Sequence, residues 1–233
     1  LLAGYALVVV AAALWLKGDA LATLALEPLL AGYGIAVTVY LLSRFALSAA
    51  YRPASPLGPD EPRPRVAVVV PAFNEEASIR ATLEAAVGLR WPRHLLHVVV
   101  VDDGSNDRTW ERIEEVRACS PSLIAVRFPA NRGKRAAMLA GIAAADGPDA
   151  VVFLDSDTLV APDALEHLLA PLVRDPRVAA VCGHAKVANR GRGLLARMQE
   201  VRYFAAFRVF KAAESLFGMV TCASGCLSAY RWS

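Results

Sequence analysis

The sequence of 233 residues has few of the residues that build zinc centres, disulfide scaffolds or nucleic-acid interfaces. Its four cysteines form no Cys-x-x-Cys pair, and its four histidines are not spaced as metal ligands, which argues against a zinc site or a disulfide framework. The formal net charge is only +3, and no basic stripe with interleaved aromatics occurs. Nucleic acid is therefore not an expected partner.

Apolar residues are, in contrast, more frequent than in a soluble domain. They make up 56% of the chain, against about 45–50% in typical globular proteins. Residues 1–16 carry no charge, and a second apolar stretch begins at Leu29 and reaches about 20 residues if it continues to Ala50. A span needs about 20 apolar residues, so we expect two transmembrane helices within residues 1–50, of which the first is incomplete.

Basic residues predict the orientation of these helices. Arg44, Arg52, Arg63 and Arg65 lie at or after the second stretch, whereas Lys17 alone lies between the two. The excess of positive charge predicts that the following domain faces the cytoplasm, in a multi-pass protein of the plasma membrane that contacts lipid. Residues 51–64, YRPASPLGPDEPRP, are rich in proline and predict an extended linker to a domain over residues 65–233.

Strands and helices alternate through this domain, which predicts an α/β fold with a doubly wound, mostly parallel sheet. Valine-rich strands such as VAVVV and VVVV are apolar on both faces, as expected when helices cover both sides. The expected strands are residues 66–70, 98–101, 123–126, 151–154 and 178–182, and the expected helices are about 75–88, 107–118, 134–145 and 162–173.

Polar clusters follow four consecutive strands of this sheet. PAFNEE, DDGSND, NRGKR and DSD come after the first, second, third and fourth strand, respectively. Ligands of such sheets bind beyond the carboxyl ends of the strands. We therefore expect the four clusters to meet at one rim.

Asp155 and Asp157, in VVFLDSDTLV, interrupt an apolar run. If the segment is extended, both carboxylates face the same side and Ser156 faces away. Two adjacent carboxylates repel each other unless a proton or a cation lies between them, and Mg²⁺ binds one or two carboxylates together with phosphate oxygens. We therefore expect a Mg²⁺ or Mn²⁺ site that includes a phosphate; the alternative is a pair of solvated loop residues that cap the next helix.

Asp102, Asp103 and Lys134 extend this prediction. A carboxylate after the second strand can accept a hydrogen bond from a pyrimidine or a ribose, although DDGS can also be only a turn and a helix cap. Lys134 follows Gly133 at the start of a predicted helix, where a cation and free backbone amides favour a diphosphate. The cluster predicts a nucleoside-diphosphate site.

Four segments in order, VAVVVPAFNEEASIRATL, VVVVDDGSNDRT, NRGKRAAM and VVFLDSDTLVAPDAL, resemble the family 2 glycosyltransferases with the GT-A fold. The resemblance implies inverting transfer of a sugar from a UDP-sugar, with Mg²⁺ or Mn²⁺ held by Asp155 and Asp157. It further implies a nucleotide pocket lined by Pro71, Ala72, Asn74, Glu75, Asp102 or Asp103, Lys134 and Asp155.

A second segment, residues 198–231, is similar to hyaluronan synthases and related chitin-type synthases, which carry a Ser-Gly-Pro-Leu-Ser-x-Tyr-Arg pattern near the acceptor sugar. This chain has Cys226 in place of the proline. The similarity implies a growing polysaccharide as acceptor, with N-acetylglucosamine and possibly glucuronic acid as donor sugars. The general base and a Gln-x-x-Arg-Trp signature are expected beyond Ser233, and the implied acceptor residues are Ser224, Gly225, Tyr230 and Arg231.

Other interpretations stay open at this point. Residues 194–218 predict an amphipathic helix that either packs on the core or lies on a membrane or a polymer path. A non-processive enzyme acting on a lipid carrier is the main competitor within the family. Outside it, Asp155 and Asp157 resemble in part the first motif of haloacid-dehalogenase phosphatases, and a non-catalytic nucleotide-binding subunit is a third possibility.

Overall fold

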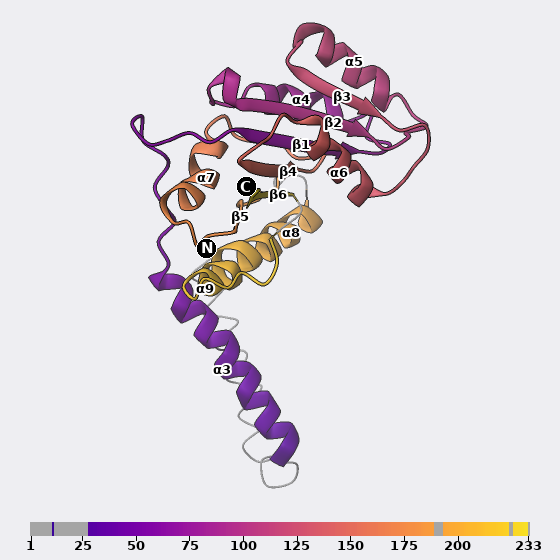
Figure 1. Ribbon diagram of the computed structural model, residues 1–233. Helices are drawn as coiled ribbons and strands as arrows, with labels where there is room; N and C mark the ends of the chain where they lie inside the picture. The colour runs from indigo at the N-terminus through magenta and orange to yellow at the C-terminus, as the bar shows by residue number, and fades with distance from the viewer. Residues whose placement is uncertain (1–10, 12–27, 189–192, 224–225, 233) are drawn as a thin grey trace.

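The computed structural model describes residue 11 and residues 28–188, 193–223 and 226–232. Most of the first predicted span, together with Ser224 and Gly225, lies outside the described residues. Within them, helix α3 (Pro28–Ala50) projects from a layered α/β body that begins with the strand at residue 66 (Figure 1).

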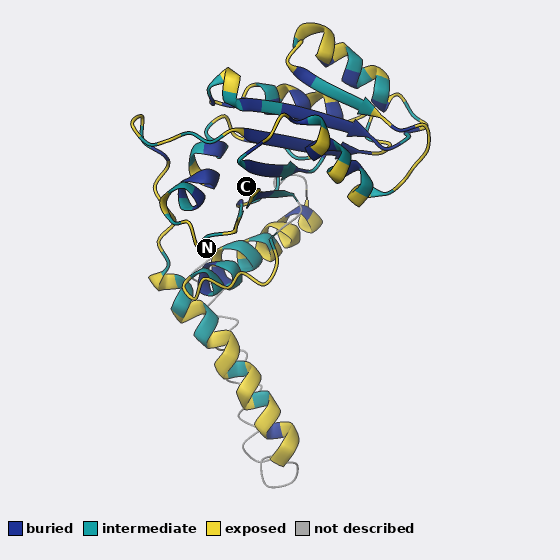
Figure 2. Ribbon diagram, viewed as in Figure 1, coloured by how far each residue is buried: buried dark blue, intermediate teal, exposed yellow. Residues whose placement is uncertain are grey.

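Helix α3 has the length and composition of a membrane span. It contains 23 residues, which at 1.5 Å per residue is about 34 Å, enough to cross a hydrocarbon core of about 30 Å. Only Ala31 is buried along it, and Figure 2 shows its surface as exposed or intermediate almost throughout. It is the one candidate span among the described residues, so a second transmembrane helix stays a prediction.

The body is built on a six-stranded mixed sheet with the order β3-β2-β1-β4-β6-β5. The first four strands in the chain are parallel to their neighbours, and β6 runs antiparallel between β4 and β5. The strands are β1 (Val66–Ala72), β2 (Leu96–Asp102), β3 (Leu123–Arg127), β4 (Ala150–Leu154), β5 (Ala180–Cys182) and β6 (Leu227–Arg231). The α/β prediction is confirmed, with one difference: β6, expected only as an acceptor segment, is a strand that separates β5 from the parallel set.

Helices cover both faces of the sheet because the strands are apolar on both. Along β1, Val66, Val68 and Val70 join one buried cluster, whereas Ala67 and Val69 join the other, which is the period-2 alternation of a strand. The first cluster is closed by α4 (Ile79–Val87), α5 (Thr109–Cys119) and α7 (Ala164–Arg174), and the second by α6 (Lys134–Ala144).

The four sheet-covering helices were predicted at the correct places, but three begin two to four residues later than expected. Residues 74–78 and 105–108 are instead held in loops by mutual hydrogen bonds. Helix α6 lies close to the sheet because Gly141 faces Val69, where an added Cβ would come within 2.3 Å of a valine methyl group. The late helix starts leave loops at the edge where the site forms.

The predicted amphipathic helix is one helical run in three parts: α8 (Leu194–Phe204), a π-helical segment η2 (Ala205–Phe210) and α9 (Lys211–Ser215). Val209, Ala212 and Ala213 in its second half are buried, and η2 and α9 pack against α3. Its first half is exposed, including the apolar side chains of Leu194 and Leu195. Each of the two expected roles therefore has support from one half of the run: core packing from the second half, and an exposed apolar surface from the first.

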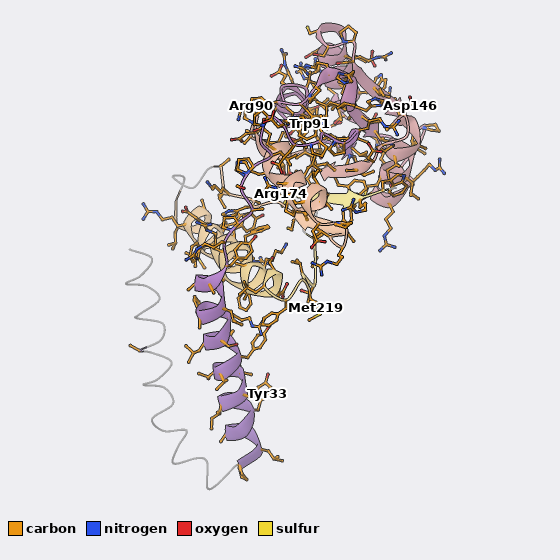
Figure 3. The ribbon with its side chains drawn as sticks, turned by 60° about the vertical axis from the view of Figure 1, so that its left-hand side comes forward. Tyr33, Arg90, Trp91, Asp146, Arg174 and Met219 are labelled. Atoms are coloured by element: carbon orange, nitrogen blue, oxygen red, sulfur yellow. The ribbon has the colours of Figure 1, made fainter. Side chains whose placement is uncertain are left out.

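Residues 51–64, here called the strap, are docked on the body rather than free. The backbone N–H of Leu57 donates to the carbonyl of Glu166 at 2.9 Å, and the Leu57 side chain is buried. Arg174 of α7 donates to both carboxylate oxygens of Glu61 at 2.7 and 2.8 Å, and it lies where the strap passes the body (Figure 3). This pairing lowers the pKa of Glu61 from 4.5 to about 2.

Candidate functional site

The carboxyl ends of β1, β2 and β4, with the loops that follow them, form one edge of the sheet, here called the rim. Pro71 and Ala72 at the end of β1 are buried and pair in register with Val101 and Asp102 of β2. The chain then turns sharply at Asn74, which has a φ of 55°. The rim therefore brings together the loops that follow β1 and β2.

These two loops are interlocked by reciprocal hydrogen bonds. The backbone N–H of Asn74 donates to Ser105 Oγ at 2.9 Å, and the N–H of Asn106 donates to Asn74 Oδ1 at 2.9 Å. The N–H of Glu75 donates to Thr109 Oγ1 at 2.7 Å. Loops with so many partners are held in one geometry, so Asn74 contributes to the shape of the rim through both its backbone and its side chain.

The side chains of Glu75 and Asp107 also serve this lock. Glu75 Oε2 accepts a hydrogen bond from the hydroxyl of Ser78 at 2.6 Å. Burial opposes ionisation of Asp107, but hydrogen bonds from the hydroxyl and N–H of Thr109 prevail and lower the pKa of its carboxyl. Phe73, between these anchored residues, is 41% exposed. An exposed aromatic ring directly after a buried strand is the signal that sequence reasoning passed over.

Asp103 clamps the loop after β2 onto the loop after β3. Its two carboxylate oxygens accept the backbone N–H groups of Arg132 and Gly133 at 2.7 and 2.9 Å, and the residue is buried. Gly104 follows with a φ of 73°, where an added Cβ would lie 2.5 Å from the carbonyl carbon of Ala130. Sequence reasoning did not find this clamp because it joins segments about 30 residues apart.

Asp102 is fully buried beside this clamp. Its Oδ1 accepts the backbone N–H of Ser105 at 3.1 Å. Its Oδ2 lies 3.2 Å from Arg127 Nε, an ion pair whose angles are not those of a hydrogen bond. One carboxylate oxygen of Asp102 therefore has acceptor capacity left.

Asp155 and Asp157 lie in a tight turn and not in an extended segment, as expected from the sequence. Strand β4 ends at Leu154, and the N–H of Thr158 donates to the carbonyl of Asp155 at 3.0 Å. Ser156 is buried and faces inward, where its carbonyl accepts the hydroxyl of Thr82 at 2.9 Å. The turn leaves both carboxylates accessible, Asp155 partly and Asp157 fully.

Lys134 links this turn to the start of α6. Its Nζ lies 2.5 Å from Asp155 Oδ1, and the two side chains are 56% and 27% exposed. The structure thus brings together a cation from the loop after β3 and a carboxylate from the end of β4, as expected from the sequence for one rim.

The predicted acceptor residues are divided between the two ends of the sheet. Because β6 is antiparallel to β4, Leu227 pairs with Leu154 at the rim and Arg231 pairs with Ala150 at the opposite end. The side chain of Arg231 donates to the carbonyls of Leu172, Asp175 and Val178. The ring of Tyr230 packs on Phe153, with centroids 5.7 Å apart.

The structure therefore does not bring Tyr230 and Arg231 to the rim. Cys226, in contrast, is adjacent to it, because its carbonyl accepts the N–H of Asp155 at 3.4 Å. Ser224 and Gly225 precede Cys226 directly but lie outside the described residues. The part of the acceptor segment at the rim is thus its beginning.

The donor set at the rim fits a hard divalent cation that also binds a phosphate. Among the described residues, no group of three or more His, Cys, Asp and Glu side chains could hold a metal without other ligands. Two accessible carboxylates next to a lysine are too few for an all-protein cage, but they suit Mg²⁺ or Mn²⁺ with phosphate oxygens and water as further ligands.

The chain matches the family model for glycosyl transferase family 2 over residues 67–233. It is 37% identical over 206 residues to the hyaluronan synthase of Streptococcus pyogenes, which is 85% of this chain and 47% of that protein. It is 38% identical over 175 residues to an N-acetylglucosaminyltransferase of Rhizobium meliloti, which is 74% of this chain and 40% of that protein. The chain thus spans about half the length of the curated relatives it matches.

Among solved structures, the chain resembles the mannosyltransferase PcManGT from Pyrobaculum calidifontis in complex with GDP-Man and Mn²⁺. The TM-score is 0.61 and the sequence identity 26%, over 84% of this chain and 55% of that one. This structure is a neighbour of the GT-A type, which agrees with the mixed α/β sheet.

Proposed function

Because this chain belongs to glycosyl transferase family 2 and is a glycosyltransferase, we propose that it is a membrane-bound, processive and inverting polysaccharide synthase of the hyaluronan synthase type. Its donor is UDP-N-acetylglucosamine, alone or together with UDP-glucuronic acid, and its acceptor is a growing polysaccharide. The similarity to a hyaluronan synthase and an N-acetylglucosaminyltransferase supports the choice of sugar. A phosphatase at Asp155 is set aside because the family is different.

The observation that carries this proposal is the meeting of Lys134 with Asp155 and Asp157 at the rim. The two carboxylates would hold Mg²⁺ or Mn²⁺, which supplies positive charge to the diphosphate that leaves when the sugar is transferred. Lys134, at the start of α6, binds the same diphosphate and adds a second positive charge. Stabilisation of a departing anion by charges held in place beforehand lowers the barrier to transfer.

The nucleoside occupies the part of the rim formed by the loops after β1 and β2. Pro71, Ala72, Asn74 and Glu75 form one wall through the interlocked backbone, and Asp102 or Asp103 contacts the uracil. Asp102 suits this contact better, because both oxygens of Asp103 already hold the next loop. The exposed ring of Phe73 gives the base a surface to stack on.

The acceptor sugar approaches from the side of Cys226. Ser224 and Gly225 are the residues of the acceptor segment that we assign to this end, since they precede a residue bonded to Asp155. Tyr230 and Arg231 support this segment from the other end of β6 and do not contact the sugar. The general base that deprotonates the acceptor hydroxyl belongs, in this proposal, to a segment after residue 233.

Membrane attachment is the remaining part of the proposal. Helix α3 is a candidate span, and η2 and α9 pack against it. The apolar side chains of Leu194, Leu195 and Met219 are 70% or more exposed, and Met219 lies on the part of the body from which α3 projects (Figure 3). We assign this surface to the lipid of a plasma membrane that the protein crosses more than once, with the sheet on the cytoplasmic side.

The test is product formation by the protein in native membranes. Radiolabelled UDP-N-acetylglucosamine is supplied alone and together with UDP-glucuronic acid, and the product is digested with hyaluronidase or chitinase. We expect a polymer only when the N-acetylglucosamine donor is present. Polymer from UDP-glucose alone, or labelled lipid without polymer, would contradict the proposal, and the second result would favour the non-processive alternative.

A further inference from the structure

Lys134 and Asp155 contact each other while no donor is bound, and this contact has a consequence for the order in which ligands bind. We propose that Lys134 holds the cation position at Asp155 in the free protein, so that a divalent metal enters only together with a nucleoside diphosphate. The inference rests on the proposed function, because it assigns to the same rim a metal and a diphosphate.

The backbone on the lysine side of the contact is fixed. Lys134 is the first residue of α6, and the N–H of the preceding Gly133 donates to Asp103 Oδ2 at 2.9 Å and to Asn131 Oδ1 at 3.1 Å. Asp103 is buried and bound to a second N–H, that of Arg132. Exchange of partners by Lys134 therefore requires rotation of its side chain only.

The backbone on the aspartate side is fixed as well. The carbonyl of Asp155 accepts the N–H of Thr158 at 3.0 Å, and its own N–H donates to Cys226 at 3.4 Å. The buried Ser156 anchors the turn to Thr82 of α4 at 2.9 Å. Asp155 thus presents its carboxylate at one place whether Lys134 or a metal is beside it.

Charge decides which cation is bound. With Lys134 on Asp155, the two carboxylates of the turn carry one uncompensated negative charge, at Asp157. A metal ion that binds both carboxylates displaces the ammonium group of Lys134, which then lies close to a dication without an anionic partner, and like charges at such distances repel. A diphosphate removes this penalty because it offers Lys134 a new partner and supplies oxygen ligands to the metal.

This account predicts opposite effects of one substitution on two binding reactions. In Lys134→Met, Mn²⁺ alone should bind about threefold or more tightly than in the wild type, since its competitor is gone. UDP in saturating Mn²⁺ should bind about tenfold more weakly, since the diphosphate loses a charged hydrogen bond. A lysine that only adds general positive charge would not discriminate between its two neighbours in this way.

Both affinities are measured by calorimetry on the full chain in detergent, with Lys134→Gln as a second neutral variant. Arg135→Met is the matched control, because it removes an exposed positive charge of the same helix turn and should change the affinity for Mn²⁺ alone less than Lys134→Met does. Unchanged or weaker binding of Mn²⁺ alone by both Lys134 variants, or equal tightening in Arg135→Met, would overturn the inference. If the wild type binds no UDP in Mn²⁺, the proposed function itself fails, which is a distinguishable result.

Discussion

Asp102 and Asp103 after β2 are buried, and Asp103 binds only backbone N–H groups. Asp155 and Asp157 after β4 lie in an accessible turn, and Asp155 binds a mobile type of partner, the long side chain of Lys134. Both pairs are acidic and separated from a buried strand by no more than two residues. The difference is that a carboxylate bonded to fixed backbone groups organises the site, whereas one bonded to a side chain can change its partner when a ligand arrives.

The largest expected effect is on ligand binding, from the accessible pair. Asp157→Asn removes a negative charge from the proposed metal site, so the affinity for UDP in Mn²⁺ should fall by about a hundredfold or more. The free energy of unfolding should change by less than about 0.5 kcal/mol, because the side chain is exposed. Calorimetry and thermal unfolding measure the two, and retained affinity for UDP in Mn²⁺ would remove Asp157 from the site.

The buried pair should show the reverse pattern. Asp103→Ala leaves the N–H groups of Arg132 and Gly133 without their acceptor, which should lower the free energy of unfolding by about 3 kcal/mol. Asp103→Asn keeps one acceptor oxygen and should lose about half as much. Urea unfolding monitored by circular dichroism checks both variants, and wild-type stability of Asp103→Ala would show that the clamp does not hold the rim.

Gly104 and Gly133 sharpen the comparison at the backbone level. Both have positive φ, but an added Cβ meets Ala130 at 2.5 Å in the first case and nothing within 4 Å in the second. Gly104→Ala should therefore cost about 2–3 kcal/mol of stability and Gly133→Ala about 1 kcal/mol. Equal losses in urea unfolding would mean that the two loops do not pack as closely as described.

The smallest expected effect lies far from the rim, in the strap. Hydrogen bonds from Arg174 lower the pKa of Glu61 from 4.5 to about 2, so the contact stabilises the folded chain above pH 4.5 and loses this contribution as the pH falls from 4.5 toward 2. Glu61→Gln should lower the melting temperature slightly at pH 7 and less at pH 3. Asp60→Asn, which removes a charge but not this contact, is the control, and equal shifts at both pH values would contradict the account.

The sequence predicted the parts of the fold that depend on local pattern. The valine-rich strands and the helices between them were expected at the right places because apolar periodicity and length are local signals. Strand β6 was missed since Leu227–Arg231 is short, contains the buried Ser228 and owes its position to pairing with β4. The strap was expected as a linker, although Arg174 binds it from more than 110 positions away in sequence.

The same limit applies to the candidate site. The sequence predicted that Lys134 and Asp155 meet, because strand ends of a parallel sheet share an edge. It did not predict the clamp by Asp103, the turn at Asp155 or the distance of Arg231 from the rim, because each depends on contacts between segments distant in sequence. The role of Phe73 follows only from its exposure.

Titration of the wild-type protein with UDP, in Mn²⁺ and again after the metal is chelated, tests the central claim that the rim is a metal-assisted nucleoside-diphosphate site. The account predicts saturable binding of UDP in Mn²⁺ and at least about a tenfold loss of affinity without the metal. Equal affinity under both conditions, or no binding under either, would contradict it.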